Sequence, residues 1–329
     1  MPTARAPVSP RQAIWLLALI LGCGGGTGAV TGESSGGAAG ATASVGATSG
    51  SGGSGGAGST TTASSTAAGT GGAATSTGAS ATGQGGSGGA ESGRGGAGGE
   101  GPSGLATLGT LVVLGDSISD GGGQSPFYYD LLKADLQARY GAIAYHNKAE
   151  SGSKTGALVS QIQSLPNTLP GPVAVTITSG GNDMKAAILQ VLTGTDGAKK
   201  AELGDNVGAA LDLLLTPDHF GPGVVVHVFE GNIYDASDGA GDFGSNGCAF
   251  GQGLPAFASD PYFDGWNQVI LDEVSQRGQT SADMHAYFYG HGYKSPPSWY
   301  ASDCTHPSAI GHAALRDLFY AQITGEPAP

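Results

Sequence analysis

The stretch Leu111-Val112-Val113-Leu114-Gly115-Asp116-Ser117 combines four consecutive apolar residues with a short polar turn. An apolar run without alternation is typical of a parallel strand that is covered on both faces. The glycine and the two polar residues predict the end of that strand. Because open parallel sheets bind ligands beyond the carboxyl ends of their strands, Ser117 is predicted to lie where a ligand would bind.

The rest of the chain after residue 105 alternates strand-like and helix-like segments. Further strands are predicted near 143–147, 173–178, 224–229 and 284–289, and helices near 126–140, 155–165, 184–215 (broken around 194–197), 262–277 and 308–323. Five βα units in order predict a five-stranded parallel sheet with right-handed crossovers. The predicted fold class is therefore α/β, a three-layer flavodoxin-like arrangement.

A second motif, Asp303-Cys304-Thr305-His306-Pro307, precedes the last predicted helix. Serine is a weak nucleophile unless a base removes its proton and a third group orients that base. His306 can be the base for Ser117, and Asp303 can orient it from one turn of the same loop. The alternative for such an Asp-x-x-His string is a helix cap followed by an exposed histidine.

Two more short motifs lie between these ends, Ser151-Gly152 and Gly180-Gly181-Asn182-Asp183, each after a strand-like run. With Gly115-Asp116-Ser117 and Asp303-x-x-His306, the ordered set resembles the four blocks of the SGNH (GDSL-type) esterase/lipase family. The resemblance covers roughly residues 106–325. It implies the same flavodoxin-like fold, a serine ester hydrolase activity, and catalysis by Ser117, His306 and Asp303.

The resemblance also implies three donors for an oxyanion hole. They are the backbone N–H of Ser117, the backbone N–H of Gly152 and the side-chain amide of Asn182. A glycine suits the second position if the backbone there approaches the reacting centre closely. A simple turn at Gly152 and an Asx-turn at Asn182 are the alternatives. The second block departs from the family pattern, since Lys148 and Glu150 precede Gly152.

The N-terminal third of the chain has a different composition. Half of the 62 glycines lie in residues 24–104, with Ala, Ser and Thr filling most other positions. Without apolar periodicity, such a segment cannot bury enough surface to offset the entropy lost on ordering. We expect a signal peptide at 1–22, a disordered Gly/Ala/Ser/Thr-rich tether at 23–105 and the hydrolase domain at 106–329.

Arg5 and Arg11 precede a short apolar stretch, 13–21, which is typical of an export signal and short for a transmembrane helix. Ile20-Leu21-Gly22-Cys23 resembles the bacterial lipobox, which implies that cleavage leaves a lipid-modified Cys23. Gly24 after the cysteine favours, by the same resemblance, the outer membrane of the cell envelope. An ordinary secretory signal and a secreted protein are the alternative.

The other two cysteines are Cys248 and Cys304. Disulfides persist in exported proteins, and with Cys23 lipidated the remaining pair suffices for one bridge. Such a bridge would hold the loop that carries Asp303 and His306. Two free buried thiols are the alternative.

Several classes of partner are not predicted. The net charge is −13 and no cluster of Lys or Arg is present, which excludes a nucleic-acid-binding face. No His-x-x-x-His or Cys-x-x-Cys motif predicts a metal site, and no phosphate-loop or dinucleotide motif predicts a cofactor. The membrane is predicted to be contacted only through the lipid anchor. The oligomeric state is not predicted.

The sequence thus predicts a serine ester hydrolase that forms an acyl-enzyme on Ser117. Short acyl groups, including acetyl groups on carbohydrates, are expected because no long apolar lid segment is visible. The segments 232–250 and 293–300 are candidates for the pocket wall. The alternatives are a non-catalytic glycan-binding lipoprotein that uses the same cleft and an acyltransferase on the same scaffold.

Overall fold

The computed structural model describes residues 104–248 and 251–329. The predicted signal peptide, Cys23 and the predicted tether as far as residue 103 lie outside these residues. The described part contains one sheet of five parallel strands, in the order β2-β1-β3-β4-β5. Its strands are β1 (Thr110–Gly115), β2 (Ala144–Asn147), β3 (Val173–Thr178), β4 (Val226–Gly231) and β5 (Thr280–Ala282). This confirms the predicted fold class.

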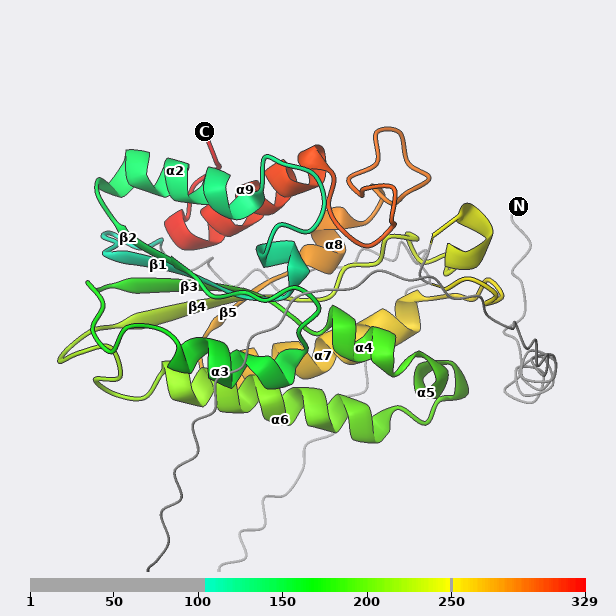
Figure 1. The fold of residues 1–329 in the computed structure, drawn as a ribbon, viewed down its shortest axis with the longest axis horizontal. Helices are drawn as coiled ribbons and strands as arrows, with labels where there is room; N and C mark the ends of the chain where they lie inside the picture. Colours follow the sequence, from blue (N-terminus) through cyan, green and yellow to red (C-terminus); the bar gives the residue numbers. More distant parts are fainter. Residues whose placement is uncertain (1–103, 249–250) are drawn as a thin grey trace, which may run out of the picture. The chain divides into compact units, whose positions relative to one another are not determined.

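Helices cover both faces of the sheet (Figure 1). One face carries α2 (Tyr128–Tyr140) and α9 (Ala309–Thr324), and the opposite face carries α3 (Leu158–Gln163), α6 (Gly197–Leu214) and α7 (Asp260–Gln276). Shorter elements follow the strand ends: η1 (Ser117–Ser119), η2 (Thr155–Ala157), α4 (Gly181–Ala186), α5 (Ile188–Thr193), η3 (Phe243–Asn246) and α8 (Met284–Phe288). None of the helices in the described ranges is long and apolar enough to cross a membrane.

The two central strands form the middle of the core. Every residue of β1 and of β3 is buried, as expected for strands with a helix layer on each side. Their register pairs Leu114 with Ile177 and Gly115 with Thr178, so both strands end at the same edge. The segments that follow them, η1 and α4, therefore begin side by side.

The predicted fifth strand, near 284–289, is wrong. That segment is α8, and β5 is the shorter run just before it. Asp283 starts the helix, because its side chain accepts a hydrogen bond from the backbone N–H of Ala286. The alternation of apolar and polar residues after Met284 imitates a strand, but the capping aspartate decides the local structure. His285 lies in this helix.

The predicted break in the segment 184–215 is confirmed. Three helices, α4, α5 and α6, replace one long helix, and α5 ends at Gly194 in the left-handed region with φ +67°. The first of them begins at Gly181, three residues earlier than expected. This start places Asn182 in the first turn of a helix at the carboxyl edge of β3.

Glu230, near the end of β4, is a fully buried carboxyl. Its neighbour Gly231 faces α8, since a Cβ there would lie 2.8 Å from the sulfur of Met284. Because successive side chains of a strand alternate, Glu230 points to the opposite face, where α6 and α7 pack. Neither carboxyl oxygen has a hydrogen-bond partner among the described residues. Burial, and secondarily the charge of Asp116, raises the pKa of Glu230 to about 8.

This buried acid predicts a pH-dependent stability. Between about pH 5 and 8 the folded protein keeps a proton that the unfolded chain releases, so the free energy of unfolding falls as pH rises. From pH 5 to pH 8, the free energy of unfolding of Glu230→Gln should rise relative to that of wild type by at least about 1 kcal/mol. The upper limit is about 1.4 kcal/mol per pH unit, which corresponds to one proton released on unfolding. Urea denaturation at pH 5, 6.5 and 8 measures this, with exposed Glu150→Gln as the control. Parallel pH dependence in wild type and Glu230→Gln would contradict the assignment.

Candidate active site

β1 ends in a bend that only glycine can form. Gly115 has φ +118°, and a Cβ there would lie 1.9 Å from the carbonyl oxygen of Thr178. The side chain of Gln161 holds both backbone groups of this residue: Gly115 N donates to Oε1 and Nε2 donates to Gly115 O, each at 2.8 Å. The bend turns the chain over the sheet edge and places Ser117 at the start of η1.

Asp116 is the N-cap of this short helix. Its Oδ1 accepts from the backbone N–H of Ile118 at 3.0 Å and from the hydroxyl of Thr178 at 3.2 Å. Burial raises the pKa of Asp116 to about 6, even though both hydrogen bonds and the nearby His306 act to lower it. The sequence motif alone predicted no separate role for Asp116. The structure shows that it holds the turn that carries Ser117.

Ser117, His306 and Asp303 are joined in one chain of hydrogen bonds. Ser117 Oγ lies 2.8 Å from His306 Nε2, and Asp303 Oδ2 lies 2.6 Å from His306 Nδ1. The second oxygen of Asp303 accepts from the backbone N–H groups of Thr305 and His306, each at 2.9 Å. Burial acts to raise the pKa of Asp303, but these hydrogen bonds outweigh it and the pKa is lowered. An ionised Asp303 can thus orient the imidazole toward Ser117.

Backbone and side-chain contacts fix the loop that carries the histidine and the aspartate. Ala301 N donates to His306 O at 2.8 Å, which closes the loop, and Tyr300 and Pro307 form an antiparallel bridge at its base. From the neighbouring segment, the hydroxyl of Tyr234 donates to Thr305 O at 2.7 Å. The position of His306 therefore depends on contacts that no local motif predicts.

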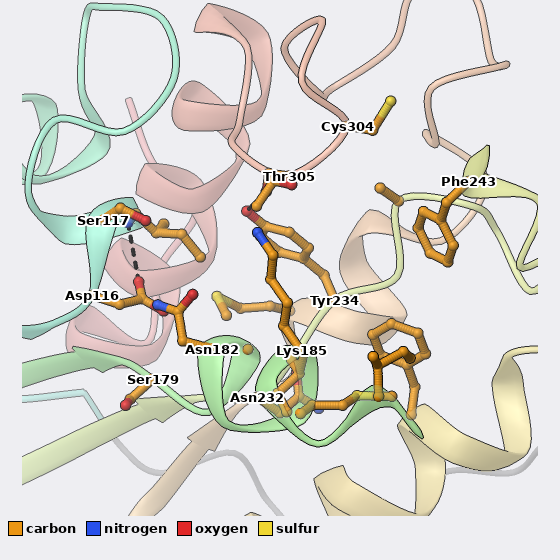
Figure 2. Close-up of a pocket in the computed structure, with 18 of the residues that line it drawn as sticks. Asp116, Ser117, Ser179, Asn182, Lys185, Asn232, Tyr234, Phe243, Cys304 and Thr305 are labelled. Carbon is orange, nitrogen blue, oxygen red and sulfur yellow. Dashed lines mark hydrogen bonds between the residues drawn. The ribbon is translucent and has the colours of Figure 1, made fainter. Parts of the chain in front are cut away.

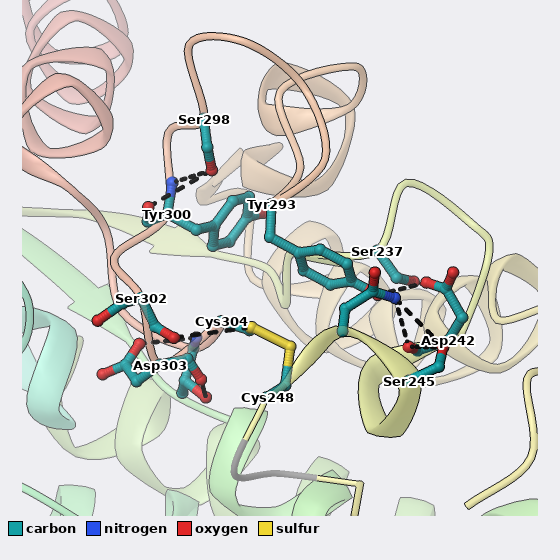
Figure 3. The surroundings of a disulfide bond; sticks show 12 residues. Ser237, Asp242, Ser245, Cys248, Tyr293, Ser298, Tyr300, Ser302, Asp303 and Cys304 are labelled. Carbon is teal, nitrogen blue, oxygen red and sulfur yellow. Dashed lines mark hydrogen bonds between the residues drawn. A yellow bond between two sulfur atoms is a disulfide. The ribbon is translucent and has the colours of Figure 1, made fainter.

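The predicted disulfide is confirmed. Cys248 and Cys304 are bonded across a sequence separation of 56 residues. Figure 3 shows Cys304 next to Asp303 on the loop, with Cys248 reaching it from the segment after η3. The bridge therefore attaches the triad loop covalently to a second loop.

The two further oxyanion candidates differ in how the structure places them. Asn182 lies beside Asp116 and Ser117 at the same side of the cavity (Figure 2), and its Nδ2 donates to Ser153 O at 2.9 Å. The second hydrogen of this amide is available to a ligand. Gly152 is exposed in a turn with φ +80°, and a Cβ there would meet no atom within 4 Å. A glycine is thus favoured at position 152 by the backbone conformation, and not by the close approach of other atoms that the sequence predicted.

A second histidine supports the back of the site. The backbone of Gly122 packs against the imidazole of His306, since a Cβ there would lie 2.5 Å from its Cδ2. His312 Nε2 lies 2.9 Å from Gly122 O, and burial lowers the pKa of His312 to about 4. A neutral His312 can therefore donate to this carbonyl. The sequence gives no signal for this contact of His312.

A cleft opens beside Ser117 (Figure 2). It contains a cavity of about 110 Å³. The segment 232–250 contributes to its wall, as expected, through Asn232, Ile233, Tyr234, Ala236 and Phe243. The segment 293–300 does not line it; Trp299 stacks instead on His291, with ring centroids 3.7 Å apart.

Several solved structures are similar to this chain. A lipase from a goat rumen metagenome is 20% identical, with a TM-score of 0.49, over 66% of this chain and 97% of that one. An extracellular lipase from Streptomyces rimosus is 20% identical (TM-score 0.46; 65% and 100% covered). An acetylxylan esterase from Geobacillus stearothermophilus is also 20% identical (TM-score 0.46; 67% and 96% covered). No curated protein sequence matches the chain.

A parallel α/β fold with serine, histidine and aspartate joined at its ligand-binding edge is the arrangement of a hydrolase of acyl compounds. The model of the GDSL-like lipase/acylhydrolase family matches residues 113–314. The chain belongs to this family, and it is a carboxylic ester hydrolase.

Removing the disulfide should affect both stability and turnover. In the chain-entropy model, opening a loop of this length lowers the free energy of unfolding by about 4 kcal/mol. We expect Cys248→Ser/Cys304→Ser to approach this loss and to lower kcat, because the loop with Asp303 and His306 loses its tether. Urea denaturation and esterase assays measure both effects, and reduced wild type should match the double variant. Unchanged stability and kcat would contradict this role.

Proposed function

We propose that the protein hydrolyses carboxylic esters through an acyl-enzyme on Ser117. The observation that supports this most directly is the continuous hydrogen-bonded chain from Ser117 Oγ through His306 to Asp303, at 2.8 Å and 2.6 Å. In the first step Ser117 Oγ bonds to the ester carbonyl carbon while its proton passes to His306 Nε2. Asp303 stabilises the resulting imidazolium without taking the proton.

The tetrahedral intermediate carries its negative charge on the former carbonyl oxygen. In this proposal the backbone N–H groups of Ser117 and Gly152 and the amide of Asn182 donate to that oxygen. One such donor is typically worth about 2.7–4 kcal/mol of transition-state stabilisation. The hydrogen bond from Asn182 to Ser153 O supports its part, because it holds the amide in place before substrate arrives.

The ester bond then breaks, and the leaving alcohol takes the proton from His306. Water repeats the sequence on the acyl-enzyme: His306 removes its proton, the hydroxide attacks, and Ser117 leaves with that proton. The products are an alcohol and a carboxylic acid. Short acyl or carbohydrate acetyl esters, which the sequence suggested, are one candidate class of substrate for this site, whereas the apolar lining of the cleft favours longer acyl groups.

Two other functions of the same site have distinct signatures. An acyltransferase would give a transesterified product when an acceptor alcohol is added to the reaction. A non-catalytic glycan-binding protein would bind polysaccharide but release no p-nitrophenol from p-nitrophenyl acetate. The joined triad favours hydrolysis or transfer over simple binding.

We further propose that the protein is exported and anchored in the cell envelope, in the outer membrane, by a lipid on Cys23. The basis is the sequence alone, in which an apolar stretch, Ile20-Leu21-Gly22-Cys23 and the glycine-rich 24–104 follow one another. The disulfide supports export, since such bonds persist in oxidising compartments. Secretion without an anchor is the alternative.

Substitutions in the triad test the catalytic proposal. Ser117→Ala should remove nearly all turnover of p-nitrophenyl acetate. Asp303→Asn should lower kcat by roughly 10³–10⁴-fold, because the imidazole loses its orienting charge. Ser302→Ala, exposed on the same loop, is the control and should retain activity. Near-normal activity of Ser117→Ala would refute the site.

Metabolic labelling with radioactive palmitate in a Gram-negative bacterial host tests the anchor. Wild type should incorporate the label and fractionate with membranes. Cys23→Ala should do neither, whereas Cys248→Ala should still be labelled. A wild-type protein without label, or a labelled Cys23→Ala variant, would rule out lipidation at this cysteine.

A further inference from the structure

We propose that the cleft beside Ser117 binds the acyl chain of the substrate and selects apolar acyl groups of about six carbons or more over acetyl groups. This inference rests on the proposed ester hydrolysis and specifies its substrate class. It differs from the short acyl groups that the sequence suggested, because the walls of the cleft come from segments that are far apart in the sequence.

The geometry of the triad assigns the cleft to the acyl half of the ester. His306 must lie next to the leaving alcohol, since it gives that group its proton. The residues that line the cleft include Ser117 and Asn182, but neither His306 nor Gly152. A carbonyl carbon bonded to Ser117, with its oxygen toward Asn182, therefore directs its alcohol toward His306 and its acyl chain into the cleft.

The lining suits a hydrocarbon chain. The apolar side chains that line the cleft include Ile118, Met184, Ile188, Ile233, Phe243 and Phe257. Figure 2 shows Ser117 on one side of the cavity and Phe243 on the opposite side. The charged residues in the lining are Asp116, which is buried, and Lys185, whose side chain extends toward Thr305. A chain that leaves Ser117 therefore follows apolar surface.

The size of the cleft argues against acetyl as the preferred group. Its cavity of about 110 Å³ exceeds the space that one methyl group fills, which is close to the roughly 30 Å³ of a water molecule. An acetyl group would place a single methyl there and leave most of the apolar wall in contact with water. Each further methylene that leaves water favours binding, so that kcat/KM should rise about fourfold per methylene where the fit is good.

The far wall is held firmly, which should limit the chain length. Phe243 opens η3, five residues before Cys248, and the disulfide fixes this segment to Cys304, itself a lining residue. Behind Phe243 lies the ring of Tyr293, with centroids 6.1 Å apart. Because the disulfide keeps Phe243 from moving aside, methylenes that extend beyond Phe243 should not raise kcat/KM further.

A chain-length series on the full-length protein tests the inference. The probes are p-nitrophenyl acetate, butyrate, hexanoate, octanoate and decanoate, each below its micelle concentration. We expect kcat/KM to rise at least tenfold from acetate to hexanoate, against a ceiling of roughly 200-fold for four methylenes at about fourfold each. The profile should then level off or fall.

Two adjacent residues of α5 offer a matched pair of variants. Ile188 lines the cleft, whereas Leu189 is 51% exposed and does not. Ile188→Ser should lower the hexanoate-to-acetate ratio of kcat/KM at least threefold, and Leu189→Ser should leave that ratio unchanged. Phe243→Ser is a second cleft variant, expected to lower the ratio as well. Thermal melts identify any variant that is unfolded.

The outcomes separate this inference from the proposed function. A flat or falling profile from acetate to hexanoate, with activity that depends on Ser117, overturns the acyl-chain assignment alone. Equal changes of the ratio in Ile188→Ser and Leu189→Ser also overturn it. Absence of hydrolysis of every ester, or full activity of Ser117→Ala, overturns the proposed function together with this inference.

Discussion

The hydrogen bond between Ser117 Oγ and His306 Nε2 joins residues that are 189 positions apart in the chain, and the site depends on it. It can form only because β1 and the loop before α9 meet at the same edge of the sheet. The bend at Gly115 directs the serine from one side, and the closed loop directs the histidine from the other. The disulfide at Cys304 and the hydroxyl of Tyr234 restrict that loop further. Such fixed geometry favours catalysis, because little reorganisation is needed when the substrate binds.

Two buried carboxyl groups near the site lower the stability of the fold. Asp116 and Glu230 are both buried, and burial is the main cause that raises the pKa of each. The charge of Asp116 raises the pKa of Glu230 further. Asp116 offsets part of its cost by capping η1. Glu230 has no hydrogen-bond partner in the described part of the chain. A carboxyl that must stay protonated destabilises the fold as pH rises. The edge of the sheet that carries the site therefore also makes the stability of the fold depend on pH.

Much of the fold was predictable because its signals are local. Apolar runs such as 173–178 are long enough to identify buried strands, and Gly194 marks a helix end. The fifth strand was misassigned because the capping role of Asp283 outweighs the alternation after it. In the site, spacing and motif order pointed to Ser117, Asn182, Asp303 and His306, and the cysteine count pointed to the disulfide. The contacts of Tyr234, Gln161 and His312 join distant segments, so no local pattern could reveal them. The composition of the cleft wall was hidden for the same reason.

Trapping the proposed intermediate tests the central claim most directly. The protein is incubated with an alkyl fluorophosphonate, which forms a stable adduct with an activated serine, and the modified residue is located by tandem mass spectrometry. The account predicts a single adduct on Ser117, formed in step with the loss of esterase activity and prevented in His306→Ala. An adduct on another residue, or inactivation without modification of Ser117, would contradict it.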